Sequence, residues 1–405
     1  MIYMRKNAFT LIELLAVIVI LAIIALIATP IILGIIKDSK DNANKRSIDN
    51  YAKAVQNALT KYQLTGKKLE INKLETINGR EFNNTDFKVE YEGNIVCDTI
   101  EIYEDGNIYL DNCVVNGDNV DYTYGIKRYS DGEIVYFDVK KGESCTNYHV
   151  NNSITGYNGY IYKDFSNKEI SKLNTQNSCL KFYAFLDNGG KILNLLLDHN
   201  TTANSVDWTN TSITTNENGP IDVLNQLKED TKDWNGTITP ENYKYKGSEK
   251  EYTVYYNKEE YKYKARLITV QEIAQIIGDD KEPVIWQNDL TPFKGMAYYL
   301  DSLSTTESET CKLGNITGCK YGWLYDRTAT YCRSYGCLNS AVNASSTNLQ
   351  TGYWTSSATV YSLFSFAVNY YGMLSSISLN CSDGASSTDC EYGVRPVIEV
   401  EKSKL

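Results

Sequence analysis

The amino-acid sequence predicts an α+β protein in three parts: a long kinked N-terminal transmembrane helix, a small antiparallel β-sheet packed on it, and a large disulfide-containing α+β domain. Three observations lead to this prediction. An apolar run of 23 residues, 14–36, passes directly into an amphipathic helical pattern. A shorter segment of alternating apolar residues then carries a hairpin signal. The remaining two thirds of the chain mix strand-like and helix-like runs and hold eight of the ten cysteines.

Length and composition narrow the possible functions. A chain of 405 residues exceeds one compact core, so two or three domains are expected. The net charge of −10 gives no electrostatic help to nucleic-acid binding. His149 and His199 are the only histidines, which leaves little material for zinc sites or His-based acid/base catalysis. We therefore expect no catalytic residues, no metal and no cofactor.

The first 36 residues predict a single membrane span with a fixed orientation. The apolar run, interrupted only by Thr29, is long enough to cross about 30 Å of hydrocarbon as a helix. Arg5 and Lys6 precede it, and basic flanking residues stay in the cytoplasm. The N-terminus is thus expected inside and everything after Lys37 outside, with membrane lipid around residues 14–36.

The segment before the apolar core reads Ala8-Phe9-Thr10-Leu11-Ile12-Glu13. It resembles the N-terminal segment of type IV pilins and pseudopilins, whose leader is removed in front of a Phe that is followed by Thr-Leu-[Ile/Val]-Glu. The resemblance implies a leader over residues 1–8, cleavage between Ala8 and Phe9 by a prepilin peptidase, and methylation of the new N-terminus. The family usually has Gly before the cleavage point. Ala8 is a tolerated small residue that bears on the rate of cleavage more than on cleavage itself.

Glu13 makes a plain membrane anchor a poor explanation of this segment. A carboxylate one turn into an apolar helix is costly in lipid, and such residues usually have a partner. In pilin filaments, the resemblance implies, that partner is the α-amino group of a neighbouring subunit's Phe9, and the pair sets the register of assembly. The alternative is an acidic residue at the membrane interface of an uncleaved signal anchor. Pro30 lies where pilins commonly have a helix-kinking proline.

The helical pattern continues beyond the membrane span. Thr65-Gly66 is a suitable stop, with Gly66 as the residue past the C-cap. We therefore predict one helix over residues 9–66, kinked at Pro30. Its apolar stripe, which should hold the next segment, recurs at steps of three and four: Ile48, Tyr51, Ala52, Val55, Ala58, Leu59 and Tyr62.

Residues 67–128 are predicted as a small pilin-like β domain. Its best-defined part is a hairpin over 94–115 with the loop Glu104-Asp105-Gly106, in which Gly106 is left-handed. In this register Cys97 faces Cys113 within bridging distance. One face is expected to pack on the helix, with the cysteine pair on the other. The helix-facing set is Val96, Ile100, Ile102, Ile108, Leu110 and Val114.

Residues 129–405 form the third predicted domain. Strand-like runs cover 134–139, 180–186, 192–197, 252–256, 361–368 and 394–400, and helix-like runs cover 221–229 and 270–277. The even number of cysteines without a CxxC favours disulfides in an oxidising compartment. Short loops close most easily, so sequential pairing is preferred while other connectivities stay open: Cys145–Cys179, Cys311–Cys319, Cys332–Cys337 and Cys381–Cys390.

Three short sequence motifs follow one another in this domain: Ala-Arg-Leu-Ile-Thr at 265–269, Gly-Tyr-Trp-Thr-Ser-Ser at 352–357, and Gly-Val-Arg-Pro-Val at 393–397. Over roughly 140 residues they resemble the signature blocks of C-type-lectin-like modules in bacterial surface proteins. The resemblance implies that Arg266 and Arg395 anchor strands, that Trp354 is core, and that Gly393 belongs to the fold motif.

Two ligand or catalytic sites of that fold are not expected here. Residues 282–284 and 286–289 depart from the calcium-ligating motifs of animal lectins, so we predict no calcium site. The spacing of Cys332 and Cys337 would suit the close cysteine pair of formylglycine-generating enzymes, which share this fold. A short structural loop is the commoner explanation in an oxidised setting.

The sequence thus predicts a type IV pilin-like filament subunit that displays a surface-binding, adhesin-like module, with a glycan or another surface ligand as the partner. An appendage of 277 residues would crowd a thin filament, which favours a minor subunit. Its partners would be prepilin peptidase and other pilin or pseudopilin subunits, and it would pass from the cytoplasmic membrane to the cell surface or an extracellular filament. Two alternatives stay open: a pseudopilin of a type II secretion or DNA-uptake machine, and a membrane-tethered enzyme.

Overall fold

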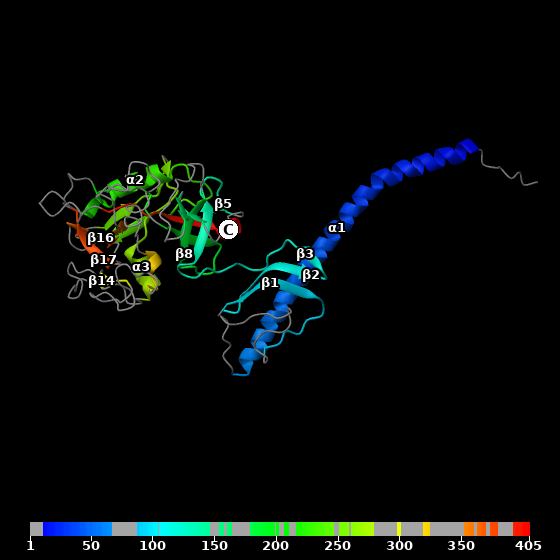
Figure 1. Ribbon diagram of the computed structural model, residues 1–405, viewed down its shortest axis with the longest axis horizontal. Helices are drawn as coiled ribbons and strands as arrows, with labels where there is room; N and C mark the ends of the chain where they lie inside the picture. Colours follow the sequence, from blue (N-terminus) through cyan, green and yellow to red (C-terminus); the bar gives the residue numbers. More distant parts are fainter. Residues whose placement is uncertain are drawn as a thin grey trace, which may run out of the picture. The chain divides into compact units, whose positions relative to one another are not determined.

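The computed structural model forms two compact units, Met1–Lys127 (unit 1) and Arg128–Leu405 (unit 2) (Figure 1). It describes residues 11–66, 87–103, 105–145, 154–157, 160–163, 179–198, 200–201, 206–209, 216–246, 251–258, 261–278, 298–300, 319–324, 352–359, 363–369, 373–379 and 392–405.

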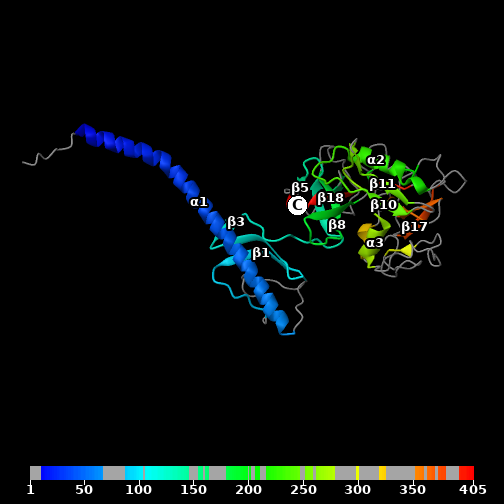
Figure 2. The same ribbon diagram turned by 180° about the vertical axis from the view of Figure 1, so that it is seen from behind.

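Unit 1 is organised by one helix, α1, over Leu11–Leu64. The helix bends along its length and continues through Pro30 (Figures 1 and 2). Proline has no N–H to donate, so the helix loses one backbone hydrogen bond in this turn. Gly66 is left-handed at φ 75° and donates its N–H to the carbonyl of Gln63 at 3.0 Å. The predicted stop at Thr65-Gly66 is therefore confirmed.

The predicted apolar stripe is the buried face of α1. Its residues from Ile48 to Leu59 are at most 7% exposed, and Tyr62 is partly buried beside them. Aromatic contacts join the stripe to the chain after the helix: Tyr51 meets Tyr91 edge-on at 5.5 Å, and Tyr62 meets Phe87 at 6.0 Å. Period-3.6 spacing alone was sufficient to identify this face.

A three-stranded antiparallel sheet packs on the stripe, in the order β1 (Ile95–Ile102), β2 (Ile108–Val115), β3 (Asp118–Val120). The predicted register is confirmed, because Cys97 lies opposite Cys113 and Ile102 opposite Ile108. Gly106, at φ 82°, makes the left-handed turn.

The face assigned to the cysteine pair was wrong. Cys97 and Cys113 are each 1% exposed and belong to the core against α1, whereas Val96 is 40% exposed. The reason lies at Asn112, whose φ of 49° is left-handed and whose pairing is skipped in the ladder. A left-handed residue interrupts the regular alternation of a strand. The buried face of β2 therefore passes from Leu110 to Cys113.

The residues of unit 2 that the structure describes form two larger sheets. The five-stranded sheet has the order β18-β9-β8-β4-β5, and the four-stranded sheet has the order β14-β17-β16-β15. The strands of the first are β4 (Ile134–Asp138), β5 (Glu143–Ser144), β8 (Cys179–Phe185), β9 (Ile192–Leu197) and β18 (Val397–Glu401). Those of the second are β14 (Tyr298–Tyr299), β15 (Gly352–Ala358), β16 (Phe364–Asn369) and β17 (Met373–Ser378).

The described part of unit 2 also contains two α-helices and three small hairpins. The helices are α2 (Ile221–Thr231) and α3 (Val270–Ile277). The hairpin strands are β6 (Ile154–Tyr157), β7 (Tyr160–Lys163), β10 (Tyr243–Lys246), β11 (Glu251–Val254), β12 (Asn257–Lys258) and β13 (Tyr261–Lys262). Both predicted helices and every predicted strand run have a counterpart, and α3 begins and ends at the predicted residues.

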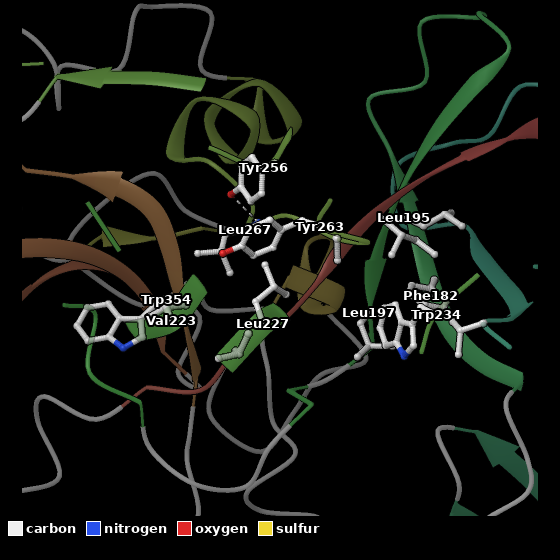
Figure 3. Packing of buried hydrophobic residues seen from close by; sticks show 14 of the residues in the cluster. Phe182, Leu195, Leu197, Val223, Leu227, Trp234, Tyr256, Tyr263, Leu267 and Trp354 are labelled. Atoms are coloured by element: carbon white, nitrogen blue, oxygen red, sulfur yellow. Dashed lines mark hydrogen bonds between the residues drawn. The ribbon is translucent and has the colours of Figure 1, made fainter. Parts of the chain in front are cut away.

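The core of unit 2 is made of two hydrophobic clusters that share strands. Phe182, Leu195, Leu197 and Trp234 lie together in the first, where Phe182 meets Trp234 edge-on at 6.1 Å (Figure 3). Strand β18 contributes Ile398 and Val400 to the first cluster and Val397 to the second, while β15 contributes Trp354 and Tyr353 in the same way. These two strands therefore connect the clusters.

Gly236→Ala should destabilise unit 2 by more than about 1 kcal/mol. Gly236 has φ 74°, and a Cβ there would lie 2.3 Å from the Cα of Gly142, so neither backbone can yield without moving the other. Gly278→Ala is the matched control, because Gly278 has φ 80° but nothing within 4 Å of an added Cβ. Urea unfolding of both variants separates the backbone strain, which they share, from the clash with Gly142. Equal losses in the free energy of unfolding would contradict a contribution from the clash.

Candidate functional site

The first half of α1 is an apolar helix that nothing in the described part of unit 1 covers. Its most apolar 18-residue window has a mean hydropathy of 3.2, and none of that window is buried. Leu11 is 85% exposed and Leu26 79%. Each fully exposed large apolar side chain forgoes about 1.5–3 kcal/mol relative to burial. This stretch is long and apolar enough to cross a membrane, and it requires lipid or other protein around it.

Glu13 is the one ionisable residue between Leu11 and Ile36. It lies in the first turn of α1, where the exposed N–H groups of a helix favour a negative charge. The predicted cleavage and methylation residues, Ala8 and Phe9, lie outside the described residues. The structure therefore places Glu13 and Pro30 on the same helix and leaves the processing point undescribed.

The second half of α1 is attached to the sheet by polar contacts at both ends of the stripe. Tyr122 donates its hydroxyl to Asp49 at 2.8 Å, and this hydrogen bond, with burial, raises the pKa of Tyr122. Lys40 pairs with Asp118 at 2.8 Å, and Lys61 with Glu90 at 2.8 Å. Such exposed pairs contribute little to stability, because solvent screens them. The buried stripe is therefore what holds the sheet, and sequence reasoning did not identify these polar contacts.

Two of the predicted disulfides are present in the structure. Cys97 is bonded to Cys113, and Cys145 to Cys179 across 34 residues. Cys319 is disulfide-bonded as well. The remaining cysteines of the predicted set lie outside the described residues: Cys311, Cys332, Cys337, Cys381 and Cys390.

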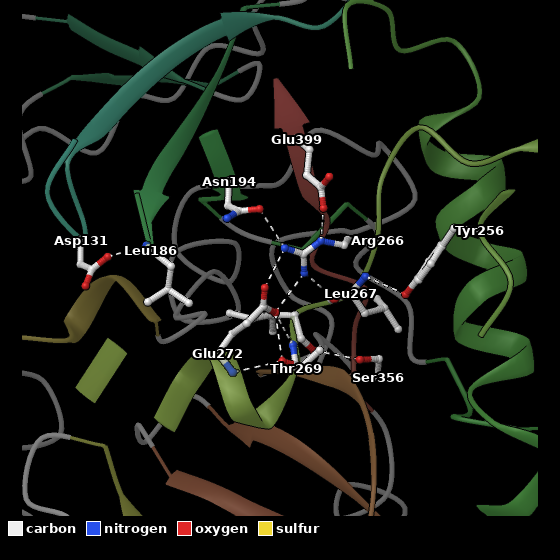
Figure 4. Close-up of polar contacts among 11 residues, drawn as sticks. Asp131, Leu186, Asn194, Tyr256, Arg266, Leu267, Thr269, Glu272, Ser356 and Glu399 are labelled. Atoms are coloured by element: carbon white, nitrogen blue, oxygen red, sulfur yellow. Dashed lines mark hydrogen bonds and ion pairs between the residues drawn. The ribbon is translucent and has the colours of Figure 1, made fainter. Parts of the chain in front are cut away.

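Arg266 is a buried cation at the junction of α3 and β18. Its Nε donates to Glu399 at 2.7 Å, and its terminal nitrogens donate to both carboxylate oxygens of Glu272, at 2.7 and 2.9 Å, and to Asn194 (Figure 4). Burial alone would lower the pKa of Arg266, but the charge and hydrogen bonds of Glu272 outweigh it and raise the pKa above its ordinary value. Glu272 also closes a capping box with Thr269 at the start of α3.

Arg395 is fully buried and donates to four backbone carbonyls at 2.6–3.0 Å. The acceptors are Leu197, Asp198, Trp323 and Leu324. Its guanidinium lies 5.0 Å from the ring centre of Tyr353. Arg395 thus ties the end of β9 to residues 323–324.

Trp354 and Gly393 also lie in the framework of unit 2. Trp354 is 1% exposed and donates its Nε1–H to the carbonyl of Val206 at 2.6 Å. A Cβ on Gly393 would lie 2.1 Å from the side-chain nitrogen of Asn200. The positions of the lectin-like motif that the structure describes are therefore packing and strand-joining positions.

No group of three His, Cys, Asp or Glu side chains is placed to hold a metal ion in the described part of the chain. Residues 282–284 and 286–289, as well as His149 and His199, lie outside that part. The structure therefore does not bear on the calcium-motif positions.

Comparisons with known proteins locate one motif. A family model described as the prokaryotic N-terminal methylation motif matches residues 3–29. No curated protein and no solved structure matches the chain. The match includes Ala8, Phe9 and Glu13 and most of the apolar run, whereas the C-type-lectin-like resemblance of unit 2 is not confirmed.

Proposed function

We propose that this chain, whose N-terminal methylation motif and long apolar helix support a type IV pilin-like protein, is a filament subunit cleaved between Ala8 and Phe9 and methylated on Phe9. The observation that carries the proposal is that the motif, residues 3–29, runs into a helix whose large apolar side chains are exposed from Leu11 to Ile36. Such a motif implies processing by a prepilin peptidase and assembly with other pilins. It favours a structural subunit over an enzyme.

The two halves of α1 support this function in different ways. The stripe from Ile48 to Leu59 is buried against the sheet of unit 1. The apolar half before it has no such partner among the described residues, so it can exchange lipid for the helices of other subunits without disturbing that core. Glu13 would then pair with the α-amino group of a neighbouring Phe9, which removes a carboxylate from lipid at the moment of assembly.

Unit 2 is proposed to be the displayed module. It spans Arg128–Leu405, more than twice the length of unit 1, which favours a minor subunit. We further propose that it is a C-type-lectin-like, adhesin-like domain that binds a glycan or another surface ligand. One support is that the three sequence motifs occur in the same order as the signature blocks of such modules. A second is that the motif residues Arg266, Trp354, Gly393 and Arg395 lie in the packed interior of an α+β unit.

Mass spectrometry of the N-terminus tests the first proposal. The chain recovered from membranes and from sheared surface material should begin at Phe9 and carry a methyl group. Ala8→Gly should be cleaved at least as completely, because Gly is usual before the cleavage point, and Ala8→Leu should keep Met1. Wild-type protein that retains Met1 and stays in the membrane fraction would contradict the proposal.

Two alternatives predict different results in the same material. A pseudopilin of a type II secretion or DNA-uptake machine would begin at Phe9 but remain with the cell envelope, and secretion or uptake would fall in its absence. A membrane-tethered enzyme would lose its activity on Cys332→Ser, whereas a filament subunit would keep its assembly.

A further inference from the structure

Unit 2 contains a lysine and an aspartate in contact, almost without solvent. The Nζ atom of Lys402 lies 2.7 Å from each of the two carboxylate oxygens of Asp187. The side chains are 6% and 0% exposed. Asp187 follows β8, and Lys402 follows β18.

Among the ion pairs of the described residues, this one has the most completely buried pair of side chains. Arg266 is 2% exposed but its partners Glu272 and Glu399 are 18% and 15% exposed, and the side chains of Lys181 and Asp198 are 14% and 11% exposed. The Lys40–Asp118 and Lys61–Glu90 pairs have side chains that are 41–84% exposed. A buried ion pair loses the hydration of both charges, and its attraction often fails to offset that loss.

Two backbone groups and a second carboxyl surround the pair. The N–H groups of Gly189 and Tyr129 each donate to one oxygen of Asp187 at 2.8 Å. Asp131 accepts the N–H of Leu186, the residue before Asp187, at 2.7 Å (Figure 4). Burial raises the pKa of Asp131 and its interaction with Asp187 acts in the same direction, while the Leu186 hydrogen bond and Lys320 oppose it.

We propose that Lys402 and Asp187 condense into an intramolecular amide bond after unit 2 folds. In the reaction the ammonium passes a proton to the carboxylate that it contacts, the Nζ lone pair attacks the carboxyl carbon of Asp187, and one carboxyl oxygen leaves as water. The ammonium and carboxylate together supply the atoms of that water, so no net proton, oxidant or further reactant is required. The product joins Nζ to the carboxyl carbon through one new C–N bond.

The geometry supplies three conditions that this reaction needs. Contact between the groups replaces a bimolecular encounter by an intramolecular one. The N–H groups of Tyr129 and Gly189 are already directed at the oxygens on which charge develops during attack. Asp131 accepts the N–H of Leu186 at 2.7 Å and thereby fixes the backbone directly before Asp187, so it is a positioning residue of this step.

The bond would join residues 215 apart in the sequence. It would fasten the end of β18 to the turn between β8 and β9, beside Tyr129, where the chain begins unit 2. Because β18 and β8 are both paired with β9, the bond closes that part of the sheet covalently. A displayed module would then resist tension applied between its first and last residues.

Mass measurement of the full-length chain, reduced and alkylated, tests the proposal. The mass of the wild type should be one water below the value calculated from its sequence. Lys402→Arg, which keeps the positive charge but has no nucleophilic amine, should have its calculated mass. Lys404→Arg, two residues along, is the matched control and should keep the deficit. Tandem mass spectrometry should find one branched peptide containing Asp187 and Lys402, and Asp131→Ala, which removes the acceptor of the Leu186 N–H, should reduce its yield at least tenfold.

A wild-type chain without the deficit would overturn the proposal and leave a buried ion pair. This measurement on wild-type protein decides the matter even if Lys402→Arg fails to fold. N-terminal processing is common to all the chains compared, so the result does not depend on the proposed filament function.

Discussion

Replacing Arg266 with methionine should lower the free energy of unfolding of unit 2 by about 3–5 kcal/mol. The substitution keeps an unbranched side chain in the site but removes the guanidinium that Glu272 and Glu399 share. Both carboxylates are then left partly buried without their cation, which costs more than the loss of a surface pair. Glu272 also caps α3, so the damage should extend to the start of that helix.

Urea unfolding monitored by tryptophan fluorescence measures this effect, because all five tryptophans are in unit 2. The full chain in detergent micelles is suitable material. The double variant Arg266→Met with Glu272→Gln should recover part of the loss, since it removes one unpaired carboxylate. Lys228→Met, an exposed lysine on α2, is the control and should change stability by less than about 0.5 kcal/mol. A loss below about 1 kcal/mol for Arg266→Met would show that the carboxylates are well solvated without it.

Replacing Glu13 with glutamine should reduce the amount of the chain in sheared filaments at least tenfold, on the proposed function. Removing one partner of a buried charge pair costs about 2–5 kcal/mol, and each 1.4 kcal/mol is about tenfold in an equilibrium constant. Membrane insertion should be unaffected or improved, because the amide is less costly in lipid than the carboxylate. The expected signature is an unchanged membrane fraction with a depleted filament fraction.

Quantitative immunodetection in both fractions checks this prediction. Glu92→Gln removes an exposed carboxylate of unit 1 outside α1 and should leave both fractions unchanged. N-terminal analysis of the Glu13→Gln chain separates failed assembly from failed cleavage. Normal incorporation of the glutamine variant into filaments would show that assembly does not require the charge pair.

Local patterns in the sequence predicted unit 1 well. The stripe on α1 follows from side-chain periodicity, and the register of β1 and β2 follows from the turn at Gly106. The orientation of the cysteine pair was wrong because one residue, Asn112, adopts a left-handed conformation that no pattern indicated. A single dihedral angle decided which face of the strand is buried.

The arrangement of unit 2 depends on contacts between distant residues, and sequence patterns do not encode these. The strands were found, but the pairing of β18 with β9 joins segments about 200 residues apart. Separation along the chain also hid the contact of Arg266 with Glu399, 133 residues away, and the Lys402–Asp187 pair, 215 residues apart. By contrast, the candidate functional segment is local: the cleavage motif, Glu13 and the apolar run lie within the first 36 residues, and the sequence identified them without the structure.

The position of β18 sets the order of events during biosynthesis. The first strand of unit 2, β4, lies in the same sheet as β18, and β9 remains without one of its two neighbours until residues 397–401 have been made. Both hydrophobic clusters are also incomplete until Val397, Ile398 and Val400 have been made. A ribosome-bound or half-translocated chain therefore cannot complete this unit. In the proposed topology, with the N-terminus inside, completion of the unit 2 core must follow the passage of nearly all of the unit across the membrane.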